Sequence, residues 1–118
     1  MREYGFERLE VWKLSRVLVG LVYTLTADFP KSELYGLTSQ IRRAAISVPS
    51  NIAEASGRSG DKDRKKFYRY AYGSLMELLN QMIISVDLNY CSESQLNDDI
   101  RPLIEKISLS LYKLKGKV

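Results

Sequence analysis

The stretch YGLTSQIRRAAISVPSNIAEASGR, residues Tyr35–Arg58, contains the pattern that decides the fold of this chain. Its apolar residues recur at steps of three and four, which places them on one face of a helix. These residues are Leu34, directly before the stretch, and Leu37, Ile41, Ala44, Ala45, Val48, Ile52 and Ala55 within it. A polar row borders this face and consists of Gln40, Ser47, Asn51 and Glu54. The pattern predicts one long helix whose polar row lies at a boundary with a neighbouring helix.

Pro49 stands in the middle of this predicted helix. A proline removes the N–H that would bond to the carbonyl of Ala45, and its ring clashes with that carbonyl, at a cost of about 3 kcal/mol. We therefore expect a kink or a break at Pro49. Two interpretations remain open: the core tolerates the kink, or the kink shapes a functional surface by aiming Ser50, Asn51 and Glu54.

Three further segments have helical periodicity. We predict these helices over residues 9–27, 62–88 and about 96–115. Short turns join the segments, so the chain favours an all-α fold, an antiparallel up-down-up-down four-helix bundle that residues 1–118 form as one domain. No alternation of the strand period is visible.

The first of these helices has more apolar residues than one bundle core needs. The expected core seam is Val11, Leu14, Leu18, Leu21 and Leu25. A second apolar row, Leu9, Trp12, Val19 and Val22, lies beside it. Either another subunit covers the second row, or the helix is internal and loosely patterned.

Local signals predict close packing and helix ends. Gly73, next to Ala71 and Ser74, predicts a small-residue patch where the second helix approaches most closely. Gly57 is expected to end the second helix as the residue just past its last turn, and Asp61 to cap the third. The fourth helix begins with a capping box, Ser92–Gln95, and Pro102 is expected to kink its first half.

Four segments in a fixed order resemble a known family. They are FERLEVWKLS (Phe6–Ser15), TADFPKSELYGL (Thr26–Leu37), GLTSQIRRAAISVPSNIAEASGR (residues 36–58) and RYAYGSLMEL (Arg69–Leu78). Together they resemble the small bacterial four-helix-bundle proteins encoded in intervening sequences of 23S ribosomal RNA genes. The resemblance runs from about Phe6 to about Leu88, and it departs from the family at Ala55, where the family usually has glycine.

The family is similar in turn to the accessory variability proteins of diversity-generating retroelements. That resemblance implies a homo-oligomer, a pentameric ring, with RNA or DNA and a protein such as a reverse transcriptase as partners. It does not imply a proven activity, since the family name records a gene location.

Composition argues against several classes of function. The chain has no histidine, which removes the commonest general base and the usual nucleophile pairs. Glu54 and Glu77, on neighbouring helices, are able to meet, but a structural pairing explains them better than acid–base catalysis. We therefore expect no enzyme, no catalytic residues, no metal and no cofactor.

The sequence also bears on where the protein is found. The longest apolar run, Val17–Val22, is far short of the ~20 residues that span a bilayer. The single cysteine, Cys91, is typical of a protein in the reducing cytoplasm.

Positive charge is concentrated in one segment. The chain has a net charge of +4, and Arg58–Arg69 holds six basic and two acidic residues. The candidate nucleic-acid-binding residues are Arg42, Arg43, Arg58, Lys62, Lys65, Lys66 and Arg69, with Tyr68, Tyr70 and Tyr72 available to stack on bases. A solvated helix start is the alternative, although basic residues there oppose the helix dipole, and bound phosphate is one way to compensate.

These observations lead to one functional hypothesis and one alternative. The hypothesis is a non-enzymatic, basic, oligomeric scaffold that binds RNA or another nucleic acid and presents it to a protein partner. The alternative is a protein–protein interaction adaptor whose basic surface meets an acidic partner and which binds no nucleic acid.

Overall fold

The computed structural model describes residues 1–116, and these residues form helices without any strand. The four helices are α1 (Glu10–Thr26), α2 (Leu37–Ser56), α3 (Asp61–Asp87) and α4 (Arg101–Lys115). Two 3₁₀ turns, Gly5–Arg8 and Lys31–Glu33, precede α1 and α2, and a π-helical segment, Gln95–Ile100, leads into α4. The predicted all-α four-helix bundle is confirmed.

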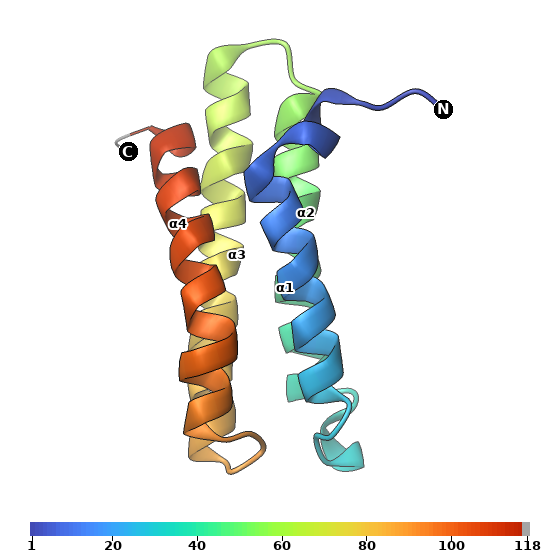
Figure 1. The fold of residues 1–118 in the computed structure, drawn as a ribbon, viewed down its shortest axis with the longest axis vertical. Helices are drawn as coiled ribbons and strands as arrows, with labels where there is room; N and C mark the ends of the chain where they lie inside the picture. Colours follow the sequence, from blue (N-terminus) through green and yellow to red (C-terminus); the bar gives the residue numbers. More distant parts are fainter. Residues whose placement is uncertain (117–118) are drawn as a thin grey trace.

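Each helix packs against two neighbours. Contacts join α1 to α2, α2 to α3, α3 to α4 and α4 back to α1, while among the described residues no Cα atoms of the diagonal pairs α1/α3 and α2/α4 lie within 8 Å of each other. In Figure 1 the sequence colours run down α1, up α2, down α3 and up α4, so the α2–α3 connection and both termini lie at one end. The α1–α2 and α3–α4 connections lie at the other end (Figure 1).

The apolar faces of the four helices meet in one core. Side chains that are fully buried include Leu18, Ile41, Ile52, Leu75, Leu78, Met82, Ile107 and Leu111. On α1 the predicted seam is partly wrong, because Leu21 is 37 % exposed and Val22 is fully buried. The observed seam includes Ser15 and Thr26, whose hydroxyls donate to the carbonyls of Val11 and Val22 four residues earlier and so become satisfied inside the core.

Helix α2 continues through Pro49 without a break. Beside it, Ser47 shares a hydrogen bond of 2.8 Å with Ser74 of α3, and the Asn51 amide donates to the Ser47 carbonyl and hydroxyl oxygens. The prediction that polar residues lie at a helix boundary is therefore correct for Ser47 and Asn51. It is wrong for Gln40 and Glu54, which are exposed, because they lie at the outer edges of the polar row.

The small-residue patch is narrower than predicted. Ala71 is buried and Ser74 faces α2, but Gly73 is exposed, and a Cβ built on it would meet nothing within 4 Å. Gly73 therefore lies on the solvent side of α3.

Glu54 and Glu77 do not pair with each other. Glu54 pairs with Arg58, and Glu77 accepts a hydrogen bond of 3.5 Å from Gln81.

The helix ends follow the chain's local chemistry with two corrections. Gly57 has φ −83°, an ordinary helical conformation rather than a left-handed one, so its lack of a side chain is not required there. Gly60, not Asp61, is the N-cap of α3, and its carbonyl accepts the Arg64 N–H. Asn89 closes α3 with φ 62°, the left-handed region that asparagine tolerates.

The start of the fourth helical segment matches the prediction. The Gln95 N–H donates to the Ser92 hydroxyl at 3.0 Å, and the Ser92 N–H donates to the Gln95 side chain at 2.8 Å, which is a capping box. Pro102 lies in the first turn of α4, where proline is tolerated, and the irregular part of this segment is the π-helical Gln95–Ile100 before the proline rather than the first half of α4. Within residues 1–116, none of the helices is long and apolar enough to cross a membrane.

Candidate nucleic-acid interface

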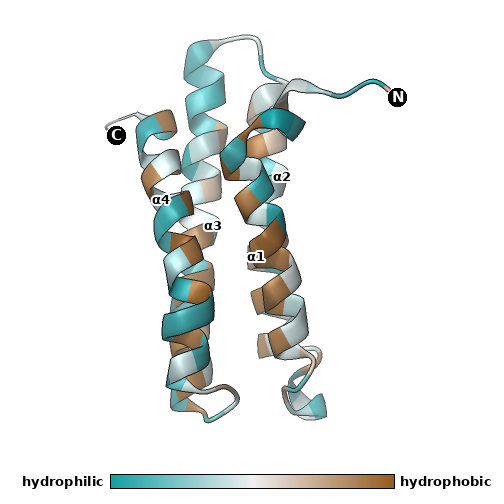
Figure 2. Ribbon diagram, viewed as in Figure 1, coloured by the Kyte–Doolittle hydropathy of each residue, from teal (hydrophilic) through white to brown (hydrophobic). Residues whose placement is uncertain are grey.

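The candidate basic residues lie in two separate places. Arg58 and the residues from Lys62 to Arg69 surround the start of α3, where Figure 2 shows a concentration of hydrophilic residues. Arg42 and Arg43 lie near the opposite end of α2, some fifteen residues before Arg58. At 1.5 Å per helical residue the separation is about 20 Å. The candidate residues therefore do not form one cluster, because Arg42 and Arg43 lie apart from the basic residues at the start of α3.

We call Arg58, Lys62, Lys65, Lys66 and Arg69 the basic end. Within it, three side chains line one groove of about 310 Å³, together with Gly60 and Asp63. The three are Lys62, Lys66 and Arg69, which follow each other by four and three positions along α3. The structure thus places these three residues on one helical face.

Aspartates near the start of α3 pair with most of this charge. Asp61 lies 3.1 Å from Lys65, and Asp63 lies 3.5 Å from Lys66 and 3.7 Å from Arg58. Acidic groups in the first turn of a helix also favour its dipole. The compensation for basic residues at this helix start therefore comes from the chain itself and does not require bound phosphate.

Lys62 and Arg69 differ from their neighbours. Neither takes part in any ion pair among residues 1–116. The pairs that the other residues make are half-exposed, and such pairs contribute only about 0–1 kcal/mol, so a phosphate group competes with them readily. With six basic and two acidic residues between Arg58 and Arg69, the basic end keeps a surplus of positive charge.

Arg64 lies among the residues of the basic end but was not predicted as a site residue. Its guanidinium donates to the carbonyls of Arg58 and Ser59, at 3.2 and 3.0 Å, and lies 3.7 Å from Asp61. Arg64 therefore holds the α2–α3 connection against the start of α3. The spacing of three residues from Asp61 is a signal that the sequence contains.

Of the three tyrosines expected to stack on bases, only Tyr70 is well exposed, at 51 %. Tyr68 is half-buried, and this burial raises the pKa of its hydroxyl, with Arg64 acting in the opposite direction. The ring of Tyr72 is covered by the Lys115 ammonium at 5.1 Å. The available aromatic surface is therefore Tyr70, whose ring meets Phe67 edge to face at 5.5 Å.

The second basic region, at Arg42 and Arg43, is held by different contacts. Arg42 donates from Nε to the Thr26 hydroxyl at 2.9 Å, and its guanidinium lies 4.6 Å from the centre of the Tyr23 ring. Arg43 beside it is exposed. Both arginines line a groove of about 500 Å³ with Tyr23, Tyr35 and Ile46. Neither arginine forms an ion pair in the part of the chain that the structure describes.

Thr26 and Tyr23 are the anchors that the sequence did not reveal. They lie on α1, sixteen and nineteen positions before Arg42. The described residues contain no cluster of three or more His, Cys, Asp or Glu side chains that could hold a metal ion.

The fold and its charged surfaces define a basic four-helix-bundle protein. The chain belongs to the 23S rRNA-intervening sequence protein family, whose sequence profile matches residues 7–113. The match includes all four helices except the last two residues of α4, so the resemblance found in the sequence is confirmed. No curated protein matches the chain.

Proposed function

We propose that this protein is a non-enzymatic, oligomeric scaffold that binds RNA or another nucleic acid through its basic end. The observation that carries the proposal is the groove lined by Lys62, Lys66 and Arg69, on one face at one end of the bundle. Membership of a family named for ribosomal RNA intervening sequences supports an association with RNA.

The chemistry of the groove suits phosphate rather than bases. Lysine and arginine side chains neutralise phosphates and release condensed counterions, which produces affinity without sequence preference. Tyr70 adds one exposed ring for base stacking. We therefore expect binding that tolerates many sequences and weakens steeply as salt increases.

The test is a salt titration of binding to mixed-sequence RNA and DNA. The triple variant Lys62→Gln/Lys66→Gln/Arg69→Gln is expected to reduce the slope of log affinity against log salt by about 2 on a single strand, since each lost phosphate contact contributes ~0.7. The matched control is Arg2→Gln/Lys31→Gln/Lys106→Gln, which removes the same charge from exposed positions elsewhere.

The control variant is expected to bind nearly as the wild type does. Equal losses in both triple variants would show that only net charge matters, and the groove would lose its role. Absence of salt-sensitive binding by the wild type would overturn the proposal.

The alternative function is a protein–protein adaptor that binds no nucleic acid. The observation that favours it is the groove at Arg42 and Arg43, which combines positive charge with exposed aromatic and aliphatic side chains. An adaptor predicts one protein partner and indifference to RNA, so the same titration separates the two.

Three parts of the proposal rest on the family resemblance and on composition. The resemblance implies a five-membered ring and a protein partner such as a reverse transcriptase. The single cysteine, Cys91, favours a reducing compartment, the cytoplasm. Light scattering at micromolar concentration tests the assembly, and a monomer there would contradict it.

A further inference from the structure

The α1–α2 face contains two adjoining grooves that share Ile46. The first is the groove of about 500 Å³ that holds Arg42 and Arg43, here called the arginine groove. The second, of about 350 Å³, lies between Trp12, Val19 and Pro49, and is called the tryptophan groove. Leu34, Tyr35 and Ile46 on this face are exposed, with Tyr35 at 94 %. One half of the face thus contains Arg42 and Arg43. The other half contains apolar side chains and one arginine, Arg16, whose guanidinium lies 5.0 Å from the centre of the Trp12 ring.

Helix α4 and the segment before it have an exposed stripe of complementary character. Its residues follow each other by four, three, four and three positions, which places them on one side of the helix. They are Asp98, Pro102, Glu105, Leu109 and Tyr112, and all five are exposed. Leu109 is 65 % and Tyr112 55 % exposed, the largest values for apolar side chains on α4. We call this the α4 stripe.

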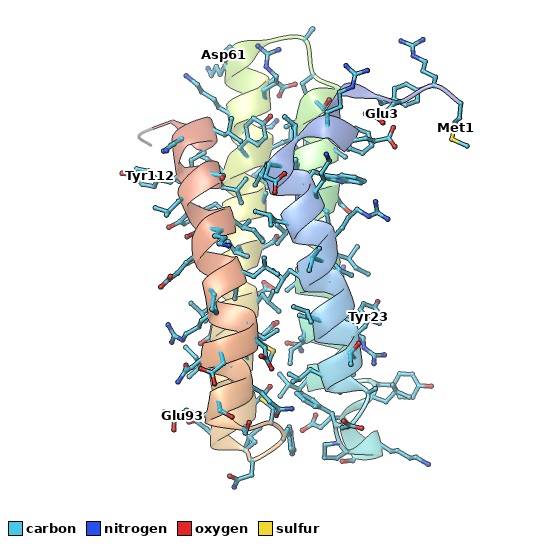
Figure 3. All side chains as sticks on the ribbon, viewed as in Figure 1. Met1, Glu3, Tyr23, Asp61, Glu93 and Tyr112 are labelled. Carbon is cyan, nitrogen blue, oxygen red and sulfur yellow. The ribbon has the colours of Figure 1, made fainter. Side chains whose placement is uncertain are left out.

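The groove face and the α4 stripe lie on opposite sides of one molecule. Figure 3 shows Tyr23, which lines the arginine groove, and Tyr112, which ends the α4 stripe, on opposite sides of the bundle. One chain therefore cannot bring its own stripe into its own grooves. A second copy can, and the contact then joins two different surfaces, which is a heterologous interface.

The two surfaces also have the same order along the bundle. The arginine groove lies towards the end with the α1–α2 connection, since Leu34 and Tyr35 line it, and Asp98 follows the α3–α4 connection at that same end (Figure 1). The tryptophan groove and Tyr112 both lie towards the other end. Two copies placed side by side in the same orientation therefore match carboxylates with arginines and apolar side chains with apolar side chains.

We infer that the α4 stripe of one copy docks on the α1–α2 grooves of a second copy in the same orientation. The inference rests on the oligomeric part of the proposed function and names the two surfaces that make the contact. Arg42 is held by Thr26 and Tyr23 before any partner arrives, so little order is lost on binding. Because Arg101 and Lys106 border the stripe, the apolar residues supply most of the affinity, and Asp98 and Glu105 supply the register.

This arrangement has a consequence for nucleic-acid binding. Copies in the same orientation all present their α2–α3 connections, and so their basic ends, on one side of the assembly. The positive fields of neighbouring basic ends then add together along a continuous surface.

Charge exchange tests the inference, with association measured by sedimentation velocity at micromolar concentration. Arg43→Glu and Glu105→Arg each place like charges opposite one another, and each is expected to weaken association at least about tenfold. The double variant Arg43→Glu/Glu105→Arg places opposite charges together again and is expected to restore association. Both positions are exposed, so folding measured by circular dichroism should not change.

The matched control is Glu93→Arg, which makes the same charge change on an exposed residue outside the stripe. It is expected to leave association unchanged. A monomeric wild type, or an oligomer that resists both single variants, would overturn the inference. RNA binding separates this failure from failure of the nucleic-acid part of the proposed function. A monomer that binds RNA contradicts the assembly and its interface but not the nucleic-acid binding, whereas an oligomer that ignores RNA contradicts only the nucleic-acid binding.

Discussion

At the start of α3, basic residues lie three or four positions from aspartates and pair with them at 3.1–3.7 Å. On α2, the two arginines of the arginine groove have no such partners among the described residues, and Arg42 is instead anchored by a threonine and a tyrosine from another helix. The first region has more basic residues, and neighbouring carboxylates neutralise part of their charge. The second region has fewer basic residues, but contacts with another helix hold Arg42 in one position. The number of basic residues in a segment therefore says less about its role than the groups that hold those residues.

The largest effect that this comparison predicts is on stability, at Arg42. Arg42→Ala removes a partly buried hydrogen bond to Thr26 and the contact with the Tyr23 ring, which together contribute about 2 kcal/mol to the free energy of unfolding. Arg43→Ala, the adjacent exposed position, is expected to change it by less than about 0.5 kcal/mol. Urea unfolding measures both, and equal effects would show that Arg42 is not anchored.

A smaller effect is expected on nucleic-acid affinity when the aspartates are removed. Asp61→Asn/Asp63→Asn frees the basic residues that these carboxylates hold, and affinity for RNA should rise about fivefold, or ~1 kcal/mol, the value of a few surface pairs. Asp28→Asn/Asp87→Asn makes the same charge change at exposed positions far from α3's start and is the control. Equal or weaker binding by the first variant would mean that the pairs do not compete with phosphate.

The smallest effect concerns Arg58. Its guanidinium lies 4.5 Å from the centre of the Phe67 ring, and lysine makes this contact less well because its charge is compact and strongly hydrated. Arg58→Lys is expected to lower the free energy of unfolding by about 0.5 kcal/mol. Arg69→Lys, which keeps the charge at a position outside any ion pair in residues 1–116, should change it less in the same thermal or urea unfolding measurement.

Helix positions were predictable from the sequence because they depend on local patterns. The apolar period set α1, and the capping box set the start of the fourth helical segment. The fine assignment of faces was less accurate. Leu21 and Gly73 were predicted to face other helices but face solvent. A periodic pattern is compatible with several rotations of a helix about its axis, and only packing against neighbouring helices selects one of them.

The candidate site was predictable in part for the same reason. Pairing of Asp61 with Lys65 and of Asp63 with Lys66 follows from spacings of four and three along one helix, and the sequence contains that information. Anchoring of Arg42 by α1 depends on contacts between residues sixteen or more positions apart, which no local pattern specifies. The separation of Arg43 from the basic end likewise depends on the course of α2.

The π-helical segment Gln95–Ile100 has a consequence for how this chain accepts changes of length. A π turn contains one residue more than an α turn, and here it lies just before Pro102, which has no N–H to make the regular helical bond. Deleting one residue within the segment converts it to an α turn and leaves the later residues in phase. Deleting one residue within α4 rotates everything beyond it by about 100° and turns Ile107 and Leu111 away from the core. Insertions and deletions in natural variants should therefore collect at Gln95–Ile100 and avoid the helix that follows.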